Sequence, residues 1–167
     1  FTPAGKVAAT FAPTGILFAD LFVVDSSSPG RIRSGNAAVS GRHDTFMTLV
    51  AFGKDGVNLI SIDGREATAD SDRLSLIDGK TGLEDVTGVS ALAAGDLEAD
   101  GDLDLVIATE NDGVRMFVNR GNRTFFELST VDKTFGKEDV ITSLAIADLD
   151  RDLDLDLVTT HQSGKVG

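Results

Sequence analysis

The chain has 167 residues, room for one ordinary domain, and 41% of them are hydrophobic, which is enough for a core. Its net charge of −12, from 27 acidic and 15 basic residues without a basic patch, argues against a nucleic-acid-binding protein. No apolar run approaches the roughly 18 residues of a membrane span, and the absence of cysteine leaves the redox compartment open.

The composition favours short strands joined by tight turns. Helix start and stop signals are scarce, whereas the chain has 18 glycines and many Val, Ile, Thr and Phe residues. The first residue is Phe1, with neither Met nor a signal peptide, and Gly167 falls within a repeated pattern. Both ends are therefore expected to be cuts through a longer protein.

The first strands are predicted by comparison within the chain. Residues 1–10 resemble residues 125–134, and both stretches are followed by Phe, so residues 1–10 are predicted to form an outer strand. The sequence ILFAD at residues 16–20 matches LAAGD at residues 92–96 and LAIAD at residues 144–148. We expect all three to be the innermost strands of their sheets.

The next stretch, residues 25–45, is polar and rich in turn-forming residues. The following predicted strand, residues 46–52, comes about 20 positions later than in the other units. One interpretation is that residues 25–45 are an insertion that replaced a metal-binding loop. The alternative is that residues 11–34 form a separate degenerate unit.

A hairpin turn is predicted at residues 54–57 (KDGV), which match residues 111–114 (NDGV). Asp-Gly between apolar runs favours a hairpin because Gly tolerates a positive φ angle. An outer strand is expected around residues 73–77. The sequences at residues 82–86 (GLEDV) and 136–140 (GKEDV) then each lead into an innermost strand.

An acidic loop begins at the end of the innermost strand predicted near residues 92–96. Carboxylates crowded into a short loop repel one another unless a cation neutralises them, and Ca²⁺ takes six to eight oxygens at about 2.3–2.6 Å. An EF-hand loop has a Glu ligand at position 12 and lies between two helices. Position 12 counted from Asp96 is Ile107, within a strand-like run, so this loop is predicted to join two strands. The predicted Ca²⁺ ligands are Asp96, Glu98, Asp100, Asp102 (through its carbonyl) and Asp104, around Gly101.

The same spacing recurs 52 residues later, which points to a repeat architecture. Leu153 stands where the first loop has Gly101, and a left-handed backbone costs a non-glycine residue about 1–2 kcal/mol. We therefore expect this second site to be weaker, or its turn to differ. Its predicted ligands are Asp148, Asp150, Asp152, Asp154 (through its carbonyl) and Asp156.

These motifs resemble the FG-GAP/VCBS repeat family, whose members form β-propellers in integrin α chains and many secreted proteins. The resemblance rests on residues 86–131, which carry a small-residue strand, the acidic loop, two further strands and an Asn-x-Gly-x-x-x-Phe sequence from Asn119 to Phe125. It implies an all-β fold, a partial β-propeller of four-stranded antiparallel blades, with Ca²⁺-binding hairpin loops between the first two strands of a blade.

The resemblance also suggests how one propeller segment, residues 1–167, is divided. Family propellers usually have seven blades, so this chain is not expected to close alone, and other blades or other chains should cover its open faces. The expected parts are an outer strand of a preceding blade (1–13), a degenerate blade with an insertion at 25–45 (14–85), a complete blade (86–139) and half of the next (140–167).

The resemblance implies a non-catalytic, calcium-stabilised module, secreted or on the cell surface, for adhesion or for recognition of a protein or matrix. The expected partner is an extracellular protein or glycan ligand. The alternatives are a lectin-like glycan-binding propeller and a structural scaffold of an extracellular filament or polysaccharide-degrading enzyme. Sugar sites usually use aromatic platforms, and the absence of Trp and Tyr disfavours the lectin. No nucleophile motif accompanies the serines, so a catalytic triad is not expected.

Smaller signals remain. His43 and His161 are expected to be surface histidines, because no Cys is present to complete a transition-metal cluster with them. The sequence Asn122-Arg-Thr124 is a glycosylation sequon, which matters only in a eukaryotic secretory protein.

Overall fold

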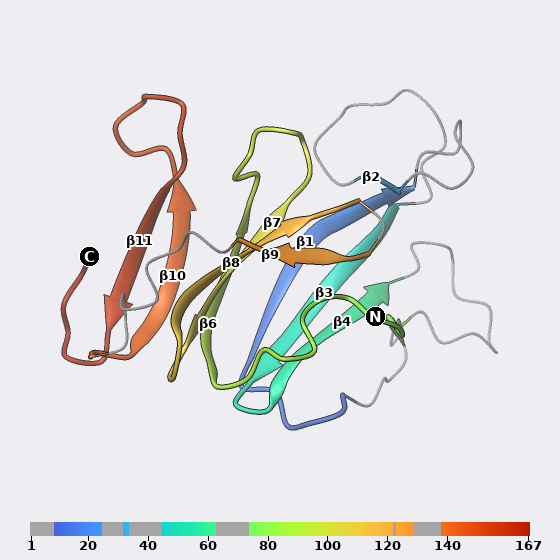
Figure 1. The fold of residues 1–167 in the computed structure, drawn as a ribbon, viewed down its shortest axis with the longest axis horizontal. Coiled ribbons are helices and arrows are strands. Elements are labelled where there is room, and N and C mark those ends of the chain that lie inside the picture. Colours follow the sequence, from blue (N-terminus) through green and yellow to red (C-terminus); the bar gives the residue numbers. More distant parts are fainter. Residues whose placement is uncertain (1–8, 25–31, 34–44, 63–73, 122, 129–137) are drawn as a thin grey trace, which may run out of the picture.

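The computed structural model describes residues 9–24, 32–33, 45–62, 74–121, 123–128 and 138–167. The described residues form three antiparallel β-sheets and no helix, so the all-β prediction is confirmed. Figure 1 shows the sheets side by side in chain order. We call them sheets A, B and C. A long apolar helix of the kind that crosses a membrane is therefore also missing from this described part.

Sheet A has the strand order β2-β1-β3-β4-β5. Its central strands match the predictions near residues 16–20 and 46–52, and a short outer strand lies within the predicted residues 73–77. β1 pairs directly with β3, with Ala19 opposite Thr48, so the predicted insertion leaves this pairing intact. The strands are β1 (Gly15–Val24), β2 (Ile32–Arg33), β3 (Thr45–Gly53), β4 (Gly56–Ile62) and β5 (Leu74–Leu76).

Sheet B is a four-stranded meander in chain order, and sheet C contains two strands. The predicted hairpin turns occur where Asp-Gly stands between apolar runs, at Gly56 and Gly113, and both glycines have positive φ. Sheet B comprises β6 (Val89–Gly95), β7 (Asp104–Thr109), β8 (Gly113–Asn119) and β9 (Phe125–Glu127). Sheet C comprises β10 (Ile141–Ala147) and β11 (Asp156–His161).

Two apolar clusters hold the sheets together, one on each face of sheet B. Between sheets A and B, Leu17, Val50 and Leu59 meet Leu105 and Phe117. All six residues of β7 are buried, as expected for a continuous apolar strand that is covered on both faces. The second cluster joins sheets B and C and consists of Ala91, Val106, Ala108, Val114 and Ile141 with the half-buried Leu97, Met116, Leu144, Ile146 and Leu157.

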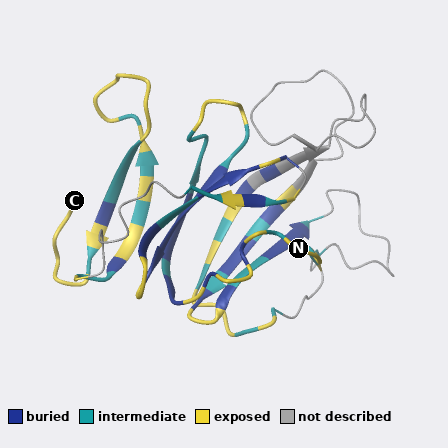
Figure 2. Ribbon diagram, in the orientation of Figure 1, coloured by how far each residue is buried: buried dark blue, intermediate teal, exposed yellow. Residues whose placement is uncertain are grey.

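Burial is uneven across the molecule. Figure 2 shows buried residues concentrated in sheet B and along the strands of sheet A that face it, while sheet C is largely half-buried or exposed. Most of the predicted outer strand at residues 1–13 and most of the predicted insertion at 25–45 lie outside the described residues. The division of the chain into blades therefore stays a prediction.

Candidate functional site: two acidic loops

The two acidic loops occupy equivalent places in their sheets. The first joins β6 to β7 and the second joins β10 to β11, as predicted for hairpin loops between the first two strands of a unit. Both loops extend from the same edge of the molecule, at the top of Figure 1. Sheet packing therefore places the two acidic loops on one side.

The loops also share one backbone shape. In the first, φ is 55° at Ala99 and 90° at Gly101; in the second, it is 67° at Arg151 and 78° at Leu153. Leu153 thus takes the left-handed conformation for which glycine is suited, and its side chain is 89% exposed. Of the two outcomes expected for Leu153, a changed turn is not observed, because the turn persists with a strained residue, and a weaker site stays a prediction.

The first aspartate of each loop explains this shape. Asp96 accepts hydrogen bonds from the backbone N–H groups of Asp100 at 3.0 Å and Gly101 at 2.9 Å. Such bonds from a short acidic side chain to nearby backbone are the local interaction that favours Asp in turns. Asp148 does the same in the second loop, accepting from Arg151 at 2.7 Å and Leu153 at 3.3 Å.

The last aspartate of each loop sits at the start of the second strand. Asp104 is completely buried and accepts hydrogen bonds from the backbone N–H groups of Leu97 and Asn119, each at 2.8 Å. Burial raises the pKa of Asp104 to about 6, even though these two hydrogen bonds lower it. Asp156 accepts the equivalent bond from Leu149 at 2.8 Å but is only half-buried.

The second loop brings three of its predicted ligands together. Carboxylate oxygens of Asp148, Asp150 and Asp156 all lie within 4.8 Å of one another. Oxygens bound to one Ca²⁺ at about 2.3–2.6 Å can be up to about 5 Å apart, so this donor set fits a hard cation. Of the residues that the structure describes, only these three meet that spacing.

Several of the predicted ligands also accept hydrogen bonds from nearby backbone N–H groups. Asp100 accepts a hydrogen bond from the N–H of Asp102 at 2.9 Å. In the second loop, Asp150 and Asp152 accept equivalent bonds from the N–H groups two residues ahead, at 3.2 and 2.9 Å. Both oxygens of Asp104 are engaged with backbone, whereas Glu98 is exposed.

One residue important to this region received no role in the sequence analysis. Asn119, at the end of β8, is buried and donates through Nδ2 to the carbonyls of Leu21 at 2.8 Å and Leu103 at 3.1 Å. Its Oδ1 accepts from the N–H of Gly121 at 2.9 Å. Asn119 thereby ties the first acidic loop to β1 of sheet A. Its place in the Asn-x-Gly motif was the available signal.

The two loops and the strands between them lie within one family match. Residues 96–159 match the model of the FG-GAP-like repeat. This segment is similar to an FG-GAP-like repeat. The resemblance stated from the sequence is therefore confirmed, and the match spans both acidic loops. Searches of curated proteins and of solved structures each returned no match.

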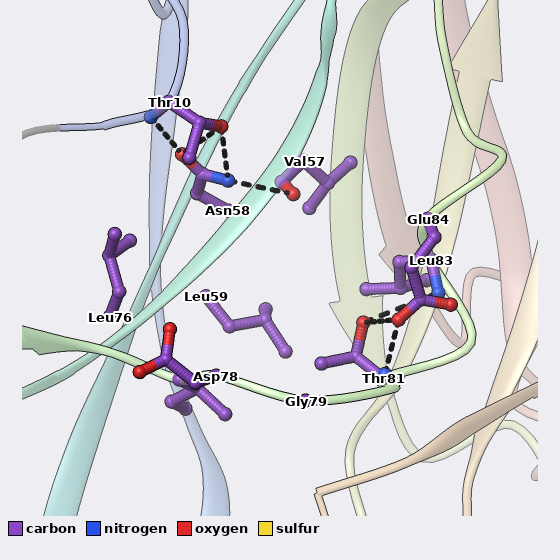
Figure 3. A pocket seen from close by; sticks show the side chains of 11 residues that line it. Thr10, Val57, Asn58, Leu59, Leu76, Asp78, Gly79, Thr81, Leu83 and Glu84 are labelled. Atoms are coloured by element: carbon purple, nitrogen blue, oxygen red, sulfur yellow. Dashed lines mark hydrogen bonds between the residues drawn. The ribbon is translucent and has the colours of Figure 1, made fainter.

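Away from the FG-GAP-like repeat, a pocket of about 210 Å³ opens beside β4 and β5 (Figure 3). Asn58 forms hydrogen bonds with Thr10 on its wall, and Glu84 accepts from the N–H and hydroxyl of Thr81. Burial raises the pKa of Glu84, but hydrogen bonds from Thr81 and Gly82 outweigh it, so the pKa lies below its ordinary value. No aromatic side chain is among the described residues that line this pocket.

His161, which follows the repeat, is not the surface histidine that the sequence predicted. Its side chain is only 12% exposed, and its ring nitrogens are hydrogen-bonded to the carbonyl of Asp139 at 3.0 Å and the hydroxyl of Thr159 at 2.9 Å. Thr159 is fully buried, so this arrangement offers no accessible nucleophile. His43 and the sequon residue Asn122 lie outside the described residues.

Proposed function

We propose that this chain is a calcium-stabilised, non-catalytic module of a secreted or cell-surface protein that recognises an extracellular protein or matrix component. The observation that carries the proposal is the convergence of three carboxylates, from Asp148, Asp150 and Asp156, in a loop of the FG-GAP-like repeat. The chain's net charge of −12 makes cation binding favourable in sign.

The residues that would hold Ca²⁺ in the second loop are these three aspartates, with Asp152 and the carbonyl of Asp154 as the further predicted ligands. The first loop would use Asp96, Glu98, Asp100, Asp104 and the carbonyl of Asp102. The bound cation supplies positive charge that neutralises a loop of mutually repelling carboxylates. The role of the aspartates is to fix the hairpin that joins the first two strands of each sheet.

Calcium binding is tested by thermal melting of the protein in Ca²⁺ and in a chelator. A cation that binds only the folded state stabilises it by about 2.7 kcal/mol at 100 times its Kd, so the melting temperature should rise by several degrees. Asp150→Asn should remove part of that rise, and so should Asp100→Ala in the first loop.

Asp154→Asn is the matched control, because only the backbone carbonyl of Asp154 is a predicted ligand and its side chain is exposed. This variant should keep the full response to calcium. Melting curves that coincide in Ca²⁺ and in chelator would refute the metal-stabilised module.

The recognition role is tested by measuring binding of the calcium-loaded protein to immobilised matrix proteins and to a glycan array. We expect binding to a protein surface that is lost in chelator. Binding to glycans alone would instead favour the lectin-like alternative, which the lack of aromatic side chains among the described pocket-lining residues disfavours. The scaffold alternative predicts calcium-dependent stability with no ligand of either class.

A further inference from the structure

At the contact between sheets B and C, large side chains of one sheet pack against small residues of the other. Sheet C presents Leu144 and Ile146 to a face of sheet B that carries Ala91 and, beyond it, Gly95. A Cβ atom added to Gly95 would lie only 3.1 Å from Cγ2 of Ile146. The small residues of β6 therefore allow the close approach of β10.

The opposite face of sheet C repeats that small-residue surface. Strand pairing places Ser143, Ala145 and Ala147 of β10 at the positions that Ala91, Ala93 and Gly95 occupy in β6. In β6 the first two of these residues are buried, whereas all three in β10 are exposed. Sheet C thus carries an equivalent small-residue surface, and none of the described residues packs against it.

The outward face of sheet A carries matching large side chains. Ile16 and Phe18 occupy in ILFAD the positions of Leu144 and Ile146 in LAIAD. Their side chains are 60% and 56% exposed, and the neighbouring Met47 on β3 is 49% exposed. These side chains point away from the cluster in which Leu17 and Val50 meet sheet B.

We propose that these two faces bind each other between copies of this chain: Ile16 and Phe18 of one copy seat on Ser143, Ala145 and Ala147 of the next. Sheet B lies between sheets A and C, so the two faces of one molecule are at opposite ends and cannot meet (Figure 2). The contact joins different faces, which makes it head-to-tail, and it gives either a closed ring or an open row of copies.

The experiment measures the mass of residues 1–167 in solution by sedimentation at increasing concentration. The wild-type chain should form species larger than a monomer. Phe18→Glu removes one face and Ala145→Glu the other, so each variant alone should stay monomeric. A mixture of the two should form a 1:1 dimer with twice the monomer mass, because one intact pair of faces remains.

Phe126→Glu is the matched control, since Phe126 is also 56% exposed but lies on the outer strand β9. It should associate like the wild type, and circular dichroism should show that all three variants are folded. A wild-type chain that stays monomeric would overturn the proposal. So would self-association of Ala145→Glu alone, which would mean that like faces pair.

Discussion

The two acidic loops have the same spacing, the same pair of left-handed residues and the same hydrogen bond from the backbone to their last aspartate. They differ in what lies beyond that aspartate. In sheet B the third strand supplies the N–H of Asn119 to Asp104, which is buried and engaged through both oxygens. In two-stranded sheet C, Asp156 is half-buried, and its carboxylate converges with those of Asp148 and Asp150.

Local sequence therefore shapes an acidic loop, while the surrounding sheet determines which groups its carboxylates contact. In the loop with a glycine at the strained position, backbone N–H groups engage both oxygens of the last carboxylate, whereas in the other loop only one such bond is made. The loop with Leu153 keeps its carboxylates near the surface, where a cation can reach them. Three changes to single residues or to pH test this comparison.

The largest expected effect is at Asn119, which supports the first loop only. Asn119→Ala removes a buried hydrogen bond to the carbonyl of Leu21 and a partly buried one to the carbonyl of Leu103, and it leaves those carbonyls without this partner. We expect a loss of about 3 kcal/mol in the free energy of unfolding, measured by urea denaturation. Asn119→Asp keeps the acceptor for Gly121 but turns a carboxylate oxygen, which cannot donate, toward the two carbonyls, so it should be no more stable than Asn119→Ala. A loss below about 1 kcal/mol would contradict the role of Asn119.

The next effect is a pH dependence that belongs to Asp104. Because its folded pKa of about 6 lies above the ordinary pKa of 3.8, the folded state binds more protons than the unfolded state between these values. In chelator, the free energy of unfolding contributed by this group should therefore fall as pH rises from about 4 to 6, on the order of 2 kcal/mol. Calcium should oppose this fall, since it binds the ionised carboxylate.

Urea denaturation in chelator at several pH values measures this slope. Asp104→Asn should flatten the slope relative to the wild type, whatever its effect on absolute stability. Asp156→Asn, which changes the equivalent residue of the second loop, is the matched control for loss of a loop carboxylate. Equal slopes for the wild type and Asp104→Asn would show that burial does not shift this carboxyl.

The smallest effect concerns the strained position of each loop. Gly101→Leu should cost about 1–2 kcal/mol, because a leucine must then adopt the left-handed conformation seen at Leu153. Leu153→Gly should stabilise by no more than about 1 kcal/mol, since the gain in the folded state is offset by greater freedom of the unfolded chain. Both are read from denaturation midpoints in chelator. If Gly101→Leu and Leu153→Gly both stabilised the protein, or both destabilised it, the two loops would not be equivalent.

Much of the fold could be predicted from the sequence, because its signals are local. Alternation, apolar runs and Asp-Gly turns depend on neighbouring residues, so the strands near residues 46–52, 105–109 and 114–118 were located closely. The acidic spacing likewise predicted both hairpin loops. The innermost strand into which residues 82–86 lead begins only at Val89, because the N–H of Val86 donates within a turn to the carbonyl of Leu83.

The strands, the loop spacing and the resemblance to the FG-GAP-like repeat follow from patterns along the chain alone. Which carboxylates converge depends on tertiary structure, because β8 reaches Asp104 from 15 residues away and competes for its oxygens. The same holds for Asn119, whose bond to Leu21 spans 98 positions, and for His161, which packing and hydrogen bonds withdraw from the surface. Contacts between distant residues depend on how sheets pack, and no local pattern records that packing.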